Sequence, residues 1–187
     1  PVDNELLRPA RKIDLKNLNV AFSCDLGFAV MSNFCKRTFL SKIEKFTGLF
    51  ASCEPRCMDL SNAHSTFMTL RSIGFLGDFG PMEQEFGAEL GEVILRELDL
   101  ARKLSSENIA KAFLDHSQIV KNGDEFFNHV DLLITPAASV PPFKHENKYP
   151  SEIDGKHYDG YLDWEAISWG ITLTQCPAVV ISCGKDE

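Results

Sequence analysis

Two short apolar runs stand out in the alternation of hydrophobic and polar positions along this chain. Residues 178–181, Ala-Val-Val-Ile, follow Pro177 and precede Ser182 and Cys183-Gly184. A short β-branched run between proline and glycine predicts a strand that is buried on both faces. Pro177 then stands at the first position of that strand, where no ladder N–H is needed. Residues 131–136, Asp-Leu-Leu-Ile-Thr-Pro, predict a second strand that stops at a proline.

The N-terminal third of the chain predicts a strand, a helix and another strand in succession. Residues 18–23 alternate loosely and lead into the turn Asp25-Leu26-Gly27. Residues 30–46 place apolar side chains at helical spacing, with most charged side chains on the other faces. Residues 49–53 predict the next strand. This spacing indicates a β-α-β unit with a parallel crossover.

The middle of the chain is predicted to be mainly helical. Helices are expected over residues 58–74, over residues 92–103, and from an N-cap at Ser105 or Ser106 onward. Glycines recur from residue 74 to residue 91 while the apolar periodicity fades. This stretch is therefore predicted to be mostly loop, and Gly123 is predicted to break the last of the three helices.

These elements indicate an α/β fold class, with a mixed, largely buried β-sheet covered by helices on both faces. Residues 144–156 are polar and are typical of a surface loop, and residues 161–170 predict a further helix. No repeat or linker divides the 187 residues, so we expect one domain. Because the chain begins with Pro1 and stops just after a predicted buried strand, we expect this domain to be truncated at both ends.

Composition and charge exclude several classes of protein. The formal net charge is −8, and lysine and arginine are scattered, so binding to nucleic acid phosphates is not expected. No stretch approaches the roughly 18 consecutive apolar residues of a membrane span, and no signal peptide pattern appears. Most of the six cysteines lie in apolar segments, which indicates reduced thiols and a cytoplasmic protein.

Three groups of residues could suggest a nucleophilic or metal site within this chain. A structural interpretation is favoured for each. His64 between Ser61 and Ser65 suggests a nucleophilic site, but neighbours on a helix point to different faces. Cys53 and Cys57 with His64 lack the four ligands and tight spacing of a zinc site. His145 and His157, near Asp154 and Asp159, form a metal site less readily than an ordinary polar loop.

The two predicted strands and the loop between them resemble the C-terminal half of the amidase signature family. In that family an aspartate precedes an apolar strand that ends in Thr-Pro, here Asp131 and Thr135-Pro136. A long loop, a helix and a Pro-Ala pair follow, and then an apolar strand ends in Cys-Gly, here Pro177-Ala178 and Cys183-Gly184. The turn Asp25-Leu26-Gly27 continues the resemblance.

The resemblance implies an amidohydrolase that acts on carboxylic amides through a serine nucleophile, a second serine in a cis peptide bond and a lysine base. It implies no metal and no organic cofactor. The chain contains no Gly-Gly-Ser-Ser-Gly-Gly run, which carries the family's catalytic serines. No catalytic residue is therefore assigned here, and we expect the catalytic residues to lie outside this chain and the chain alone to be inactive.

The resemblance also implies that this part of the protein forms a wall of the substrate site. The candidate lining residues are Thr135, Pro136, Tyr161, Trp164 and Trp169. The alternative is that the two tryptophans simply pack their helix against the sheet. Where many family members have Asn and Gly before the Pro-Ala pair, this chain has Gln175-Cys176, which removes the backbone freedom of a glycine.

The partners expected from the resemblance are a small-molecule amide and the rest of the amidase chain, with a homodimer possible. Contact of this half with nucleic acid or with a membrane is not expected. Two alternatives stay open. One is a non-catalytic, amidase-like binding or scaffolding domain, and the other is the amidase subunit of a tRNA-dependent amidotransferase.

Overall fold

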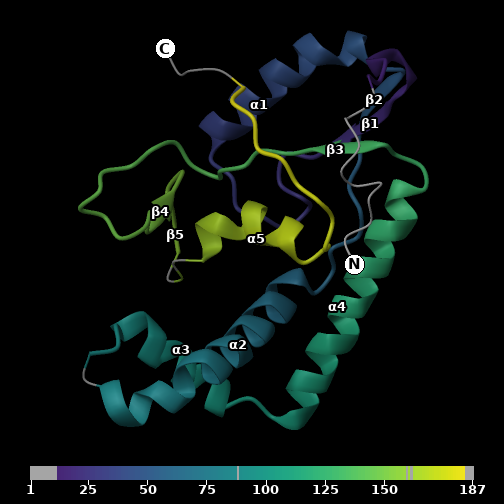
Figure 1. Cartoon of the computed structure of the whole chain (residues 1–187). Helices are drawn as coiled ribbons and strands as arrows, with labels where there is room; N and C mark the ends of the chain where they lie inside the picture. Colours follow the sequence, from purple (N-terminus) through teal and green to yellow (C-terminus); the bar gives the residue numbers. More distant parts are fainter. Residues whose placement is uncertain (1–11, 88, 159, 161, 184–187) are drawn as a thin grey trace.

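A computed structural model describes residues 12–87, 89–158, 160 and 162–183 of the protein (Figure 1). The helices are α1 (Asn33–Phe46), α2 (Ala63–Phe86), α3 (Glu92–Arg102), α4 (Ser106–Phe127) and α5 (Ala166–Thr172). The strands are β1 (Asn19–Phe22), β2 (Ser52–Pro55), β3 (Leu132–Ile134), β4 (Glu152–Ile153) and β5 (Lys156–His157). The short 3-10 helices are η2 (Leu15–Asn17), η3 (Thr47–Leu49) and η4 (Asp163–Glu165).

β1 lies in the centre of a three-stranded sheet with the order β2-β1-β3. Both pairings are parallel, with Val20 opposite Cys53 on one side and opposite Leu132 on the other. The predicted β-α-β crossover through α1 is therefore confirmed. The sheet itself is parallel, so the expectation of a mixed sheet is wrong. Antiparallel pairing occurs in the separate hairpin of β4 and β5, within and just beyond the predicted polar loop.

Helices lie on both faces of the sheet, as predicted. Ala21 belongs to the buried core shared with α4 and α5, in which Ile119 and Ile167 are both 1% exposed. The next residue along β1, Phe22, points to the opposite face and meets Phe39 of α1, with 6.4 Å between the ring centroids. Burial is strong in β1, whereas the side chains of β2 and β3 are exposed or half-buried.

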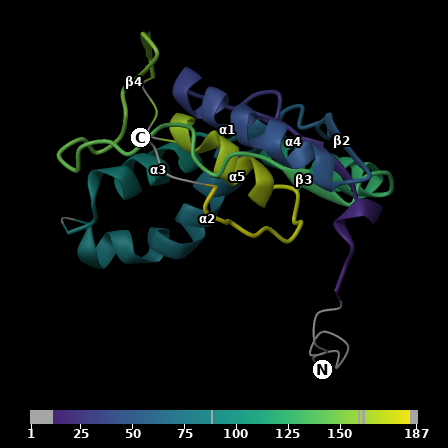
Figure 2. The ribbon, with the colours of Figure 1, turned by 90° about the horizontal axis from the view of Figure 1, so that it is seen from above.

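A helical layer extends the molecule beyond the sheet. Figures 1 and 2 both place α2 and α3 at the other end of the molecule from β2. α2 packs against α3 and α4, and the buried Ser72 hydroxyl donates to Glu97 Oε2 of α3 at 2.9 Å. Leu98 of α3 has no exposed surface. α3 is thus attached to α2 by both apolar and polar contacts.

The predicted loop over residues 74–91 is wrong, because α2 continues without a break to Phe86. Gly74, Gly77 and Gly80 fall inside this helix, and so does Pro81. Each glycine costs a helix about 1 kcal/mol relative to alanine, and an internal proline costs about 3 kcal/mol. Packing against α3 and α4, which a local pattern does not report, offsets these costs.

The predicted break at Gly123 is also wrong, although the predicted start of that helix is confirmed. Ser105 and Asn108 form a capping box at the N-terminus of α4, and the helix runs through Gly123 to Phe127. A Cβ at Gly123 would lie 3.7 Å from Met58 Sδ and 3.8 Å from Cys176 Sγ. Both distances are ordinary van der Waals contacts, so Gly123 is buried in packed surroundings and does not mark a helix end.

Two predicted strands do not match the structure as expected. β2 begins at Ser52, because the 3-10 turn η3 occupies the start of the predicted strand. Residues 178–181 form no strand, and Val179, Val180 and Ile181 are 87%, 77% and 80% exposed. The predicted burial of this segment is wrong for the described chain, since no neighbouring strand within it pairs with the segment.

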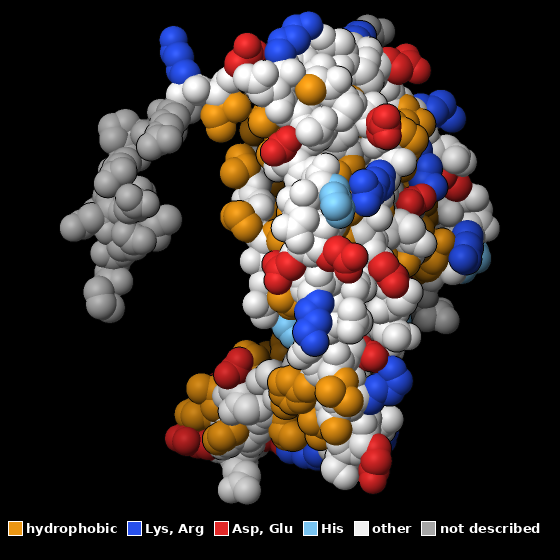
Figure 3. Space-filling model, turned by 90° about the vertical axis from the view of Figure 1, so that its right-hand side faces the viewer, with side chains coloured by type: hydrophobic (Ala, Val, Ile, Leu, Met, Phe, Trp, Pro, Cys, Tyr) orange, Lys and Arg blue, Asp and Glu red, His pale blue; other side chains and the backbone are white. Residues whose placement is uncertain are grey.

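The described residues carry free thiols, and some of their apolar side chains are exposed. The six cysteines, all within the described ranges, are free thiols. Among the residues that the structure describes, no helix combines the length and apolarity needed to cross a membrane. Figure 3 shows apolar side chains gathered at the lower end of one face, at the height of α2, α3 and the start of α4. Exposed apolar residues in α4 include Phe113 and Leu114.

A matched pair of leucine substitutions tests this packing. Leu98→Ala should lower the free energy of unfolding by about 2–5 kcal/mol, because it removes buried methyl groups and leaves a cavity. Leu114→Ala, at a side chain that is 73% exposed, should change it by less than about 0.5 kcal/mol. Urea denaturation followed by circular dichroism measures both. Equal losses for the two variants would contradict the placement of α3.

Candidate functional site

The carboxyl ends of β1, β2 and β3 meet at one edge of the parallel sheet. The chain passes from β1 to β2 on one side and later to β3 on the other. In open α/β sheets, ligands bind outside the carboxyl ends of the strands at such a reversal of strand order. The loops that follow β1 and β3 are therefore where a ligand-binding site is expected.

The loop after β1 is a tight turn whose polar groups hydrogen-bond to one another. The Leu26 N–H donates to Ser23 Oγ at 2.9 Å, and the Gly27 N–H donates to Asp25 Oδ1 at 3.0 Å. Leu26 and Gly27 both have left-handed backbones, with φ of 53° and 79°. Lys36 Nζ of α1 forms an ion pair with Asp25 Oδ2 at 3.0 Å. The Lys36 ammonium beside this turn is thus held in an ion pair with Asp25.

The surroundings of this turn keep the thiols of Cys24 and Cys57 protonated. Burial by itself raises the pKa of the Asp25 carboxyl, but hydrogen bonds from Lys36 and Gly27 outweigh burial and the net pKa is lowered. Burial and the Asp25 charge raise the pKa of the Cys24 thiol against the opposing charge of Lys36. Burial also raises the pKa of Cys57, despite its hydrogen bond with Ser23. Since the thiolate is the nucleophile, neither cysteine is activated.

The loop after β3 carries two of the residues predicted to line the site, Thr135 and Pro136, both half-buried. The Thr135 and Ser139 hydroxyls are buried and have no hydrogen-bond partner among the described residues. Ser139 has no exposed surface, and its carbonyl accepts from the Ser32 N–H at 2.8 Å. A buried hydroxyl without a hydrogen-bond partner costs about 1–3 kcal/mol, and such groups are rare in folded proteins.

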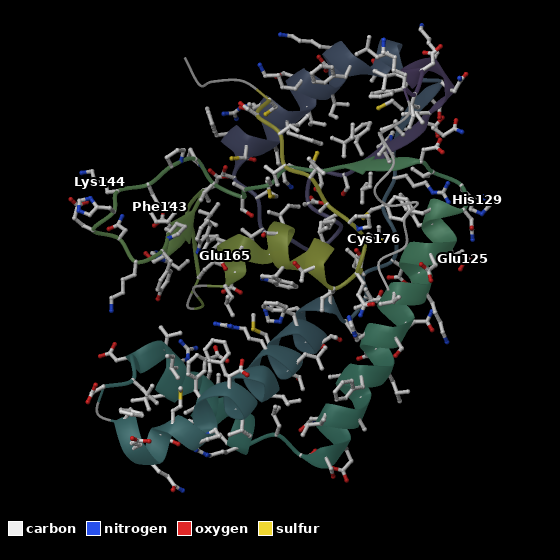
Figure 4. The ribbon with its side chains drawn as sticks, viewed as in Figure 1. Glu125, His129, Phe143, Lys144, Glu165 and Cys176 are labelled. Atoms are coloured by element: carbon white, nitrogen blue, oxygen red, sulfur yellow. The ribbon has the colours of Figure 1, made fainter. Side chains whose placement is uncertain are left out.

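Trp164, a third predicted residue, forms an aromatic pair with Phe143 near the far end of the same loop. Their rings meet edge to face at 5.4 Å and 87°, and Trp164 Nε1 is buried without a partner among the described residues. Figure 4 shows Phe143 and Glu165 on the side of the molecule that carries this loop. Burial raises the pKa of Glu165, and the charge of Arg71 offsets part of that rise.

A hollow of about 550 Å³ runs along the loop from Phe143 to Glu152. Phe143 belongs both to the lining of this hollow and to the pair with Trp164. Its lining comes wholly from this one loop and is mostly polar, so the hollow is an open surface recess. A second cavity, of about 120 Å³, lies between Asn19, Arg56 and His129, and its size suits only a few water molecules. We therefore take the loop after β3, with its buried hydroxyls and the Phe143–Trp164 pair, as the candidate site.

Trp169 lies elsewhere, in the core between α5 and α2. It is 5% exposed and stacks on Phe67 with 4.4 Å between centroids and 6° between planes. Its Nε1 donates to the Leu162 carbonyl at 3.0 Å. The alternative interpretation of this tryptophan, packing of its helix, describes these contacts. Tyr161, the remaining predicted residue, lies outside the described residues.

The structure shows the surroundings of the other groups that the sequence suggested as sites. His64 Nε2 lies 3.6 Å from Asp163 Oδ1 and meets the edge of Trp169. Within the described ranges, no three His, Cys, Asp or Glu side chains form a group that could hold a metal ion. His145 and His157 each lie near a glutamate of their own loop. Asp159 lies outside the described residues.

Sequence reasoning missed Phe143, Glu165 and the ion pair of Asp25 with Lys36. A usable signal for Phe143 exists, because Pro141-Pro142 directly precede it and restrict the backbone there. The ion pair joins residues 11 apart on different elements, so spacing alone does not reveal it.

Comparison with known families identifies the chain. The profile of the family named Amidase matches residues 1–187, the whole of the sequence. The chain belongs to the amidase family. The predicted resemblance to amidase signature enzymes is thereby confirmed, and no curated protein matches this chain.

A solved structure supports the fold of this amidase family chain. It is a bacterial aryl acylamidase that belongs to the amidase signature enzymes, with a TM-score of 0.71 and 15% sequence identity. The match covers 86% of the present chain and 36% of the acylamidase chain. The chain thus spans little more than a third of that structure. At this identity the comparison establishes the architecture, and the roles of individual residues rest on their own geometry.

A pair of tryptophan substitutions separates core packing from the candidate site. Trp169→Phe should lower the free energy of unfolding by about 1 kcal/mol, because it removes the buried hydrogen bond from Trp169 Nε1 to the Leu162 carbonyl, which then keeps only the Glu165 N–H as a donor. Trp164→Phe should cost less, because the lost N–H has no partner. Guanidinium chloride denaturation gives both values. The reverse order would contradict the assignment of Trp169 to the core.

The lowered pKa of Asp25 gives stability a defined pH dependence. A carboxylate with a lowered folded-state pKa stabilises the fold above its ordinary pKa of about 4, and this contribution is lost as the pH falls through the lowered value. Asp25→Asn should therefore be less stable than wild type at pH 7, and the difference should shrink below about pH 4.

The control for this experiment is Asp99→Asn. Its ion pair with Lys103 is well exposed, with both side chains more than 60% accessible, at 63% and 68%. Exposed pairs contribute little to stability, so this variant should follow wild type at each pH. A difference for Asp25→Asn that is constant from pH 7 to pH 3 would contradict the titration of this carboxyl.

Proposed function

We propose that this chain is the C-terminal part of an amide hydrolase and that its loop from Thr135 to Phe143, with Trp164, forms one wall of the substrate site. The observation that carries the proposal is the match of the amidase family along the whole chain. The fold of an amidase signature enzyme supports it independently. The catalytic residues of this hydrolase lie in polypeptide outside the 187 residues.

The chemistry proposed for the whole protein is acyl transfer through a Ser-cisSer-Lys arrangement. A serine hydroxyl adds to the amide carbonyl, the amine leaves with a proton, and water then releases the carboxylic acid from the acyl-serine. Two observations support placing this nucleophilic serine in polypeptide outside the 187 residues. The sequence has no Gly-Gly-Ser-Ser-Gly-Gly run. Lys36, the lysine nearest the Ser23 turn among the contacts described, is paired with Asp25 and is not a free base.

The substrate class that fits the candidate site is an amide with an aromatic group. Edge-to-face packing of Phe143 and Trp164 offers apolar aromatic surface at the end of the loop after β3. The structurally similar enzyme is an aryl acylamidase by name, which supports the same class. The proposed enzyme uses no metal or organic cofactor, and its free thiols suit a reducing compartment such as the cytoplasm.

The experiment compares the longer protein that contains these residues with the 187-residue chain alone. Hydrolysis of 4-nitroacetanilide releases coloured 4-nitroaniline, and a fluorophosphonate reporter labels activated serines. The longer protein should give both signals, and the shorter chain should give neither, because no activated nucleophile lies in it. Acetamide serves as the matched substrate without an aromatic ring, and it should be hydrolysed with a higher KM.

Two results would overturn the proposal. One is hydrolysis by the 187-residue chain that disappears when one of its own serines is replaced by alanine. The other is a correctly folded longer protein that neither reacts with the fluorophosphonate nor hydrolyses either amide. The second result would favour a non-catalytic, amidase-like binding domain.

A further inference from the structure

One face of α2 lies against the turn η4 and the helix α5. His64, Phe67 and Arg71 share this face, because a helix repeats every 3.6 residues. Phe67 stacks on Trp169 of α5, and Figure 1 shows α5 between the sheet and the layer of α2 and α3. The two basic residues on either side of Phe67 are therefore held near the start of α5.

Both of these basic side chains face an acidic residue of η4. His64 Nε2 lies 3.6 Å from Asp163 Oδ1. Burial raises the pKa of Glu165, and the positive charge of Arg71 offsets part of this rise, so the two groups are close enough for their charges to interact. Asp163 and Glu165 flank Trp164 in the sequence. A charge interaction with α2 therefore lies on each side of this tryptophan.

Arg71 is the more firmly held of the two bases. Its side chain is 16% exposed, against 59% for His64, and exposed ion pairs contribute little. Arg71 Nε lies 3.8 Å from Glu97 Oε1 of α3, and the Ser72 hydroxyl donates to the other oxygen of Glu97 at 2.9 Å. The guanidinium also lies over the ring of Phe75, 4.1 Å from its centroid. The planar fork of an arginine can serve two carboxylates at once, here Glu97 and Glu165.

The position of Trp164 depends on such neighbours. Its Nε1 is buried and has no hydrogen-bond partner among the described residues, so no hydrogen bond of the indole fixes the ring. Its ring meets Phe143 edge to face, and this contact requires η4 to stay beside the loop after β3. An interaction that holds the adjacent Glu165 carboxylate therefore also limits where Trp164 can lie.

We propose that Arg71 is a positioning residue of the substrate site, which holds Glu165 against the layer of α2 and α3 and thereby keeps Trp164 in the aromatic wall. The inference rests on the proposed function, which makes Trp164 part of that wall. Arg71 itself touches no substrate in this arrangement. The other charged groups described around Glu165 are Asp163 of the same turn, His64 of α2 and, beyond Arg71, Glu97 of α3.

Fluorine NMR of 5-fluorotryptophan tests the link between Arg71, Glu165 and Trp164. The 187-residue chain contains two tryptophans, and Trp164→Phe identifies which of the two signals belongs to Trp164. The Trp164 signal should shift with pH as Glu165 titrates, whereas the signal of Trp169 serves as an internal reference. Glu165→Gln should abolish this shift, because glutamine does not titrate.

Substitutions of Arg71 give the direction of the effect. Arg71→Gln removes the charge that lowers the pKa of Glu165, so the midpoint of the Trp164 titration should move to higher pH. Arg71→Lys keeps the charge and should bring the midpoint back toward that of wild type. The matched control is Arg102→Gln, because Arg102 also joins α3 to α2 through a glutamate, Glu83. This control variant should titrate like wild type.

Kinetics of the longer protein test the effect on the substrate site. Glu165→Gln leaves the contact of Arg71 with Glu97 in place, so it tests the proposal even where Arg71→Gln fails to fold. It should raise KM for 4-nitroacetanilide about 2- to 5-fold, as for the loss of one partly exposed ion pair, and change kcat by less than about 2-fold. KM for acetamide, which has no ring to contact Trp164, should stay unchanged.

The outcomes separate this inference from the proposed function. A Trp164 signal that does not respond to pH, or that titrates unchanged in Arg71→Gln or Glu165→Gln, would overturn the inference. Equal movement of the Trp164 and Trp169 signals would overturn it too, in favour of a general structural effect. An active longer protein whose KM for both amides is unchanged in Glu165→Gln would overturn the inference and leave the proposed function intact. The expected titration, together with a longer protein that hydrolyses neither amide, would support the positioning of Trp164 and contradict the enzyme.

Discussion

The double pairing of β1 holds the candidate site in place. β1 hydrogen-bonds to β2 on one side and to β3 on the other, and the bonding continues into the loops. The Ser23 N–H donates to the Ile134 carbonyl at 3.0 Å, and the Arg56 N–H donates to the Phe22 carbonyl at 3.0 Å. The loops that follow all three strands therefore start from fixed positions. The loop after Ile134, which we propose as a wall of the substrate site, is held in place by these hydrogen bonds.

The aromatic contacts of Trp169 in α5 are a second constraint on the structure. Trp169 stacks on Phe67 of α2 and lies 5.3 Å from the ring of Phe28, just after the β1 turn. A Cβ at the neighbouring Gly170 would come within 2.9 Å of Phe28, so glycine permits this close approach. The aromatic cluster thus links the helical layer to the sheet, and it sets where Trp164, on the turn before α5, meets Phe143.

The polar groups of this chain are arranged for positioning more than for reaction. Asp25 and Lys36 neutralise each other, the nearby thiols are held protonated, and His64 lies against Asp163. The features left over are aromatic surface at Phe143 and buried hydroxyls in the loop after β3. A pocket wall needs just such apolar area with a few polar atoms, whereas a nucleophile needs a base beside it. This division fits the pocket wall that we propose for the chain.

The sequence by itself determined the family, the α/β class, the β-α-β unit and the loop that follows Thr135 and Pro136, because these depend on local periodicity and on short motifs. The tertiary structure decided the rest. It extended α2 through its glycines, since packing against α3 and α4 outweighs propensity. It also placed Trp169 in the core and Trp164 beside Phe143, a choice that composition does not encode.

The β-branched run at residues 178–181 shows most clearly what a sequence pattern leaves undecided. Its pattern predicts burial between neighbours, but burial requires those neighbours to be present, and the described chain leaves the run exposed.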